Sequence, residues 1–84
     1  EPDNPKASFY RGICLLELDR GAEARAVFEP LAAGNSALKE DATWYIALSY
    51  LKEQDKAACK SALMKIDTSS AHHAEAREIL KGLY

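Results

Sequence analysis

Residues 44–59 of the chain read WYIALSYLKEQDKAAC, and the first half of this stretch decides the fold. From Trp44 to Leu51 the residues are apolar on nearly every side of a helix, and Ser49 is the one interruption. A helix of a small globular protein normally shows one apolar stripe and one polar face. We therefore expect this helix to be covered on two sides, by its own hairpin partner and by a further helix.

The composition is that of an ordinary folded domain. The chain has 84 residues, of which 48% are hydrophobic and 29% charged, and this length predicts a single compact unit. Its net charge of −2 provides no basic surface for nucleic acid. No apolar run approaches the roughly 20 residues needed to cross a bilayer, and no secretory signal is present. We expect no nucleic-acid partner and no membrane insertion by this segment.

Helix signals run along the whole chain, whereas the sequence contains neither an alternating Val/Ile/Thr run nor an Asn-Gly or Asp-Gly turn. Asn4-Pro5 is typical of a helix start. Gly34-Asn35 indicates a helix end, with the glycine suited to a left-handed conformation. Apolar residues recur at i, i+3, i+4 and i+7 in the segments between such signals. We predict an all-α fold with five helices near residues 5–18, 21–33, 37–52, 55–66 and 70–82.

The chain also repeats itself at an offset of 35 residues. Small residues fall on small ones and large residues on large ones, as in the pairs Ala7/Ala42, Phe9/Trp44, Gly12/Ala47, Ala24/Cys59 and Phe28/Leu63. A period of this length, with two helices in each unit, predicts helix–turn–helix repeats that stack side by side. Close helix contacts are expected at the small positions, and stacking accounts for the apolar helix that follows Trp44.

These repeats resemble the tetratricopeptide repeat family. The family pattern is W-x2-L-G-x2-Y, then A-x3-F, then P, over 34 residues. Ala24-x3-Phe28 matches the second part, and Gly12 takes the small position of the first. Ser8 and Thr43 stand where the family has Trp, and neither repeat ends in Pro. The resemblance covers about residues 5–70.

The resemblance implies a right-handed superhelix. Residues 1–4 would be the tail of a preceding repeat, with Pro2 at its closing position, and residues 5–38 and 39–69 would form two repeats. Residues 70–84 would form a C-terminal capping helix. The chain starts without Met, so we expect it to be part of a longer protein. Its sequence is also similar to the C-terminal repeats of bacterial envelope proteins. Those proteins often carry a membrane anchor upstream, which would place this domain outside the inner membrane, and a cytoplasmic location stays open.

The resemblance also implies a protein-interaction scaffold, in which the first helix of each repeat lines a concave groove for a partner peptide or helix. Exposed aromatic residues are favoured as binding anchors. The residues expected at this groove are Phe9, Tyr10, Ile13, Trp44, Tyr45 and Leu48, with Lys6, Glu17, Asp41 and Lys52 at its rim. The Lys and Asn with which one subclass grips a C-terminal carboxylate are replaced here by apolar residues, so that clamp is absent.

Two alternatives stay open for the same residues. The aromatic side chains can simply form the core. The module can also be purely structural, joining further repeats of a longer array or a second copy of the chain. Because the first helix carries apolar residues around most of its surface, we expect a weak symmetric dimer through its Tyr10–Cys14 side.

Nothing in the sequence indicates an enzyme. It contains no Gly-rich phosphate loop, HExxH or GxSxG motif, so we expect no catalytic residue and no cofactor. His72-His73 point about 100° apart on a helix, so they suit a solvated helix start better than a metal site. Cys14 and Cys59 stand among apolar residues without a CxxC spacing, which predicts two small, buried, unpaired side chains.

Overall fold

Helix α1 (Pro5–Glu17) begins at the predicted Asn4-Pro5 pair. In the computed structural model, which describes residues 4–34 and 37–83, the Asn4 side-chain oxygen accepts hydrogen bonds from two backbone amides. These are the amides of Lys6, at 3.0 Å, and Ala7, at 3.3 Å. Pro5 takes the first helical position. The backbone N–H of this position has no acceptor within a helix, so its absence in proline costs no hydrogen bond. The predicted closing role of Pro2 lies outside the described residues.

Four further helices follow: α2 (Gly21–Ala33), α3 (Lys39–Lys52), α4 (Lys56–Leu63) and α5 (His73–Leu83). The described residues contain no strand, so the predicted all-α class is confirmed. Helix α4 ends three residues earlier than predicted, and α5 begins three residues later. Ser70 explains the later start of α5, because its hydroxyl and its carbonyl accept from the amides of His72 and His73, both at 3.1 Å, and close a turn ahead of the helix.

The turns of the two hairpins have the same backbone geometry, at the offset of 35 residues. Asp19 and Gln54 both adopt a left-handed φ of 62°. In each turn the next residue donates its backbone N–H to the carbonyl five positions earlier, at 2.9 Å. Gly34, the glycine predicted to be left-handed, instead follows the end of α2 with an extended backbone, at φ −87° and ψ −170°. Both left-handed positions among the described residues are therefore held by side-chain-bearing residues.

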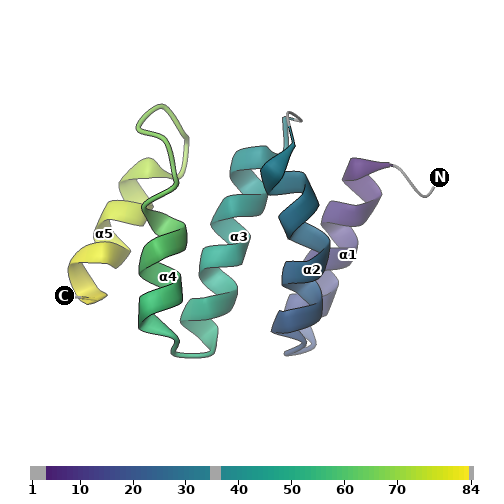
Figure 1. Cartoon of the computed structure of the whole chain (residues 1–84), viewed down its shortest axis with the longest axis horizontal. Coiled ribbons are helices and arrows are strands. Elements are labelled where there is room, and N and C mark those ends of the chain that lie inside the picture. Colours follow the sequence, from purple (N-terminus) through teal and green to yellow (C-terminus); the bar gives the residue numbers. More distant parts are fainter. Residues whose placement is uncertain (1–3, 35–36, 84) are drawn as a thin grey trace.

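The helices pack in chain order, each against the next, and α1 also touches α3 (Figure 1). The molecule measures 41 × 28 × 15 Å, so it is a flat stack of helices. Two apolar clusters hold it together. One joins α1, α2 and the start of α3 around Phe9, Ala24, Phe28 and Ala42; the other joins α3, α4 and α5 around Trp44, Ala47, Cys59, Ala62, Leu63, Ile66 and Ala76.

Helix α3 belongs to both clusters. Tyr45 and Ile46 pack against each of them, so this helix is covered on two sides, as its apolar sequence predicts. Ala24 and Ala47 are fully buried. A side chain added at Gly12 would place its first carbon 2.6 Å from the Phe28 ring, which shows how closely α1 and α2 approach.

Ser49, the polar interruption of the apolar helix, is fully buried and fully satisfied. Its hydroxyl donates to the Ile46 carbonyl at 2.6 Å and accepts from the Arg25 guanidinium at 2.9 Å. That guanidinium also lies 4.2 Å from the centre of the Tyr50 ring and pairs with Glu53 at 3.1 Å. Ser49 is therefore one of the polar links that hold α2 onto the C-terminal part of α3.

Candidate functional site

A groove of about 400 Å³ runs between α1 and α3, which are the first helices of the two hairpins. We refer to it as the α1–α3 groove. Its floor is apolar and its charged residues lie at one end. The residues that line it are Ile13, Leu16 and Glu17 of α1 with Tyr45, Leu48, Leu51 and Lys52 of α3.

The structure brings five of the residues predicted from the sequence into this groove: Ile13, Glu17, Tyr45, Leu48 and Lys52. Sequence reasoning missed Leu16 and Leu51, which complete the apolar floor. Leu51 is 37% exposed despite its size. Leu16 and Leu51 each follow a predicted groove residue, Ile13 or Leu48, by three positions, and this helical spacing is the signal that could have identified both.

The predicted groove positions of Phe9 and Trp44 are wrong. Both side chains are buried, with 8% of each exposed, and each belongs to one of the two apolar clusters. The Phe9 ring meets the rings of Phe28 and Tyr45 edge-on, at 5.8 and 5.5 Å between centres. These aromatic residues thus follow the alternative interpretation, that of core packing.

His72 contradicts its prediction as a solvated residue. It is half-buried, and its ring lies parallel to the Trp44 indole at 4.8 Å between centres. Its Nε2 atom is 2.7 Å from a carboxylate oxygen of Asp41. Asp41 therefore anchors the segment before α5 to α3 and is no rim residue of the α1–α3 groove. The neighbouring His73 is also half-buried.

The remaining two predicted residues, Tyr10 and Lys6, are exposed on α1 outside the groove lining. Tyr10 is 56% exposed and meets the Phe9 ring edge-on at 5.9 Å. Neither residue lines the groove, so the predicted set divides into groove residues, core residues, exposed residues of α1, and Asp41, which pairs with His72.

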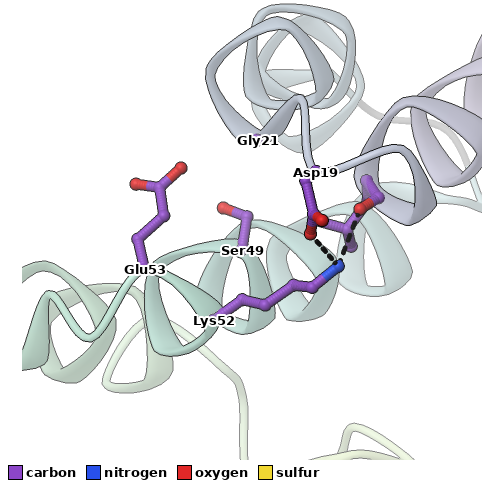
Figure 2. Close-up of a pocket in the computed structure, with 6 residues that line it drawn as sticks. Asp19, Gly21, Ser49, Lys52 and Glu53 are labelled. Atoms are coloured by element: carbon purple, nitrogen blue, oxygen red, sulfur yellow. Dashed lines mark hydrogen bonds and ion pairs between the residues drawn. The ribbon is translucent and has the colours of Figure 1, made fainter.

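A smaller cavity of about 120 Å³, lined mainly by polar and charged residues, adjoins the groove (Figure 2). Leu16 and Lys52 line both the cavity and the groove. The Lys52 ammonium donates to the Leu16 carbonyl at 3.0 Å and pairs with the Asp19 carboxylate at 2.8 Å. The hydrogen bond and charge of Lys52 hold the pKa of Asp19 below its ordinary value. Lys52 thus ties the first hairpin turn to the end of α3 and closes this end of the groove.

A second groove, of about 560 Å³, lies over α3 between α2 and α4. Small side chains dominate its walls, and Ile46 and Tyr50 lie at its base. It is lined by Glu29, Ala32, Ala33, Lys39, Thr43, Ile46, Tyr50, Ala58, Ser61, Ala62 and Lys65. None of the residues predicted for partner binding lies in it.

The two cysteines occupy opposite environments, although the sequence predicts both as buried. Cys59 is fully buried, and this burial, together with the nearby charge of Asp55, raises the pKa of its thiol. Cys14 is exposed, because it faces away from both apolar clusters. Both thiols are unpaired, as predicted.

Residues 4–34 and 37–83 contain no group of three or more His, Cys, Asp or Glu residues arranged to hold a metal ion. Within the same ranges no helix is both long and apolar enough to span a membrane.

Comparison of the chain with protein-family models, with curated proteins and with solved structures found no match.

Proposed function

We propose that the chain is a tetratricopeptide-like scaffold that binds a peptide or helix of a partner protein in the α1–α3 groove. Residues 5–38 and 39–69 would form its two repeats, within a right-handed superhelix, and residues 70–84 its cap. The observation that supports this function is the groove itself: a continuous apolar floor, open to solvent, between the first helices of two stacked hairpins. The two hairpin turns, equal in backbone geometry at the repeat offset, support the repeat assignment.

The floor determines what kind of side chain the partner must supply. Its exposed apolar surface comes from aliphatic residues on α1 and α3, with Tyr45 at one side. Removing such apolar surface from water contributes about 25 cal/mol of binding free energy per Å². A matching partner therefore presents one or two aliphatic or aromatic side chains to this floor. Binding would therefore be driven mainly by these apolar contacts.

The charges at the end of the groove add a preference for a cationic partner. Lys52 is already engaged by Asp19 and the Leu16 carbonyl. Glu17 is exposed and has no ion-pair partner among the described residues. A Lys or Arg beside the apolar residues of the partner would complete this end of the groove.

A peptide-display selection against the immobilised chain tests the proposal. We expect enriched peptides to combine apolar residues with at least one basic residue. Leu51→Asn removes apolar floor without changing the charge and should weaken their binding by about tenfold. Met64→Asn makes the same type of change at a residue that is 68% exposed on the end of α4, and should leave binding unchanged. Selected peptides that bind both variants equally well would contradict the proposal.

A further inference from the structure

The outer side of α1 carries a row of exposed residues opposite its buried side. They recur at spacings of three and four, which places them on one face of the helix. We call this row the outer stripe; its members are Ala7, Tyr10, Arg11, Cys14, Glu17 and Leu18. Tyr10 is 56% and Leu18 65% exposed, and both are among the four large hydrophobic residues exposed in the described part of the chain.

The corresponding face of α3 is buried, because a neighbouring helix packs on it. At the offset of 35 residues, Ala7 and Cys14 correspond to Ala42 and Ser49, and both of these are fully buried. They lie under α2, through the Phe28 cluster and the Arg25 hydrogen bond. The outer stripe is thus a helix-packing face that lacks a packed helix among the described residues.

The outer stripe is arranged almost symmetrically about Cys14. Arg11 and Glu17 lie three residues before and after it, and Tyr10 and Leu18 lie four residues before and after it. With successive residues about 100° apart, Tyr10 and Glu17 fall on one edge of the stripe and Arg11 and Leu18 on the other. In an antiparallel pair of such helices, each edge faces the same edge of the partner.

We infer that two copies of the chain associate through the outer stripe, with antiparallel α1 helices and a two-fold axis at Cys14. On one edge, the Tyr10 hydroxyl can donate a hydrogen bond to the carboxylate of the partner's Glu17. On the other edge, Leu18 packs against the aliphatic stem of the partner's Arg11. The inference does not depend on the proposed function of the groove, although one member of the outer stripe, Glu17, also lines the groove.

The charges favour the antiparallel arrangement over the parallel one. With the axis at Cys14, Arg11 and the partner's Glu17 lie at the same level, about 4.5 Å along the helix from Cys14, but on opposite edges, so their opposite charges attract across the interface without forming an ion pair. A parallel pair would instead set the like charges of Arg11 and the partner's Arg11 at one level, again on opposite edges, and would place Glu17 against the partner's Leu18 and Arg11 against the partner's Tyr10. The antiparallel pair also opposes the two helix dipoles.

Disulfide trapping tests the arrangement. Diamide takes up two electrons and two protons as two Cys14 thiols join in a disulfide, and only copies that bring these thiols together are trapped rapidly. We expect the full chain to form a Cys14–Cys14 dimer, identified on a non-reducing gel and by peptide mass mapping. The buried Cys59 should take no part while the chain is folded.

The double variant Cys14→Ser/Ala7→Cys is the matched control. Ala7 is on the same stripe, seven residues from the axis, so in an antiparallel dimer its two copies lie about 21 Å apart. We expect this variant to be trapped at least about tenfold more slowly, because a disulfide needs Cα atoms within about 7 Å. Equal trapping of the two proteins would indicate a parallel pair and would overturn the inference.

Sedimentation equilibrium gives a test that needs no cysteine chemistry. We expect the mass to rise from the monomer value of 9.2 kDa toward twice that value as the concentration approaches millimolar. Leu18→Lys should weaken the association by about tenfold, whereas Met64→Lys, at a similarly exposed residue elsewhere, should not. A strict monomer at millimolar concentration, without Cys14 trapping, would refute the dimer.

Discussion

Helices α1 and α3 are equivalent in the sequence repeat but not in burial. Cys14 and Ser49 occupy the same position, yet the apolar cysteine is exposed and the polar serine is fully buried. Tyr10 is more than half exposed, whereas its equivalent Tyr45 is half-buried. The difference arises because α2 covers this face of α3, while no helix covers the same face of α1 among the described residues. Burial in a stacked fold therefore depends on the neighbouring helix as well as on the residue's own polarity.

Phe28→Ala should produce the largest effect, because Phe28 links the two hairpins. Its ring is fully buried, meets Phe9 edge-on and stacks on Tyr45 at 5.7 Å. We expect a loss of about 3–5 kcal/mol of unfolding free energy, measured by urea denaturation. Leu18→Ala, on the uncovered α1 face, should cost about 0.5 kcal/mol or less. If Phe28→Ala leaves the chain unfolded, Phe28→Leu should still fold with a smaller loss; equal costs at positions 28 and 18 would contradict the packing.

Ala47→Leu should come next in magnitude. Ala47 is fully buried in the cluster of the second hairpin, where extra methylene groups force neighbouring side chains aside. We expect a cost of about 1–3 kcal/mol in chemical denaturation. The same change at Ala26, exposed on α2, should stay within about 0.5 kcal/mol of the parent. A neutral result at Ala47 would mean that this position is not a close helix contact.

The Cys14 and Ser49 pair gives the most direct test of the comparison. Ser49→Ala removes the buried acceptor of the Arg25 guanidinium and should cost about 1–2 kcal/mol. Cys14→Ser makes the uncovered helix more polar at the same repeat position and should change the unfolding free energy by about 0.5 kcal/mol or less. Thermal and urea denaturation of the two variants, run in parallel on dilute monomer, measures both changes in unfolding free energy. Similar losses for both would show that α1 and α3 are covered alike.

The two thiols should differ in a smaller, pH-dependent way. Burial raises the pKa of Cys59, so the folded chain keeps this proton at a pH where the unfolded chain has lost it. The unfolding free energy should therefore be unaffected below the ordinary thiol pKa of about 8.5 and should decrease as the pH rises above it. Cys59→Ala should remove this part of the pH dependence, and Cys14→Ala should keep it. Equal slopes for the two variants would show that Cys59 does not titrate differently on folding.

The sequence predicted the helices well because their signals are local. The Asn4-Pro5 start and the apolar spacing act within a few neighbouring residues, and they located α1 to within one residue. The starts and ends of α4 and α5 were less accurate, since the hydrogen bonds of Ser70 replace a turn of helix by a separate turn. The left-handed residues were missed because Asp19 and Gln54 adopt a conformation that favours glycine.

The site was predicted only in part, because contact across the stack depends on tertiary neighbours. Ile13 and Leu48 were placed in the groove by the family resemblance, which assigns the first helix of each repeat to this surface. Trp44 could not, since the residue that covers its indole, His72, is far away in the sequence and held by Asp41. The exposure of Cys14 was likewise unpredictable from its apolar surroundings, because it follows from the absence of a neighbour. Short-range patterns thus determine the helices and their faces, while the covering helix determines which face becomes core.

The order of the helices in the stack has a consequence for folding. Each helix packs mainly against the next one in the chain, so most contacts close short loops and the chain has a low contact order. Such topologies fold fast. Tyr45 and Ile46 of α3 pack against both apolar clusters. Unfolding of either hairpin would therefore remove contacts of α3 and weaken the cluster of the other hairpin. The backbone amides of α3 are therefore expected to exchange with solvent last, and the two hairpins to unfold as a single cooperative unit.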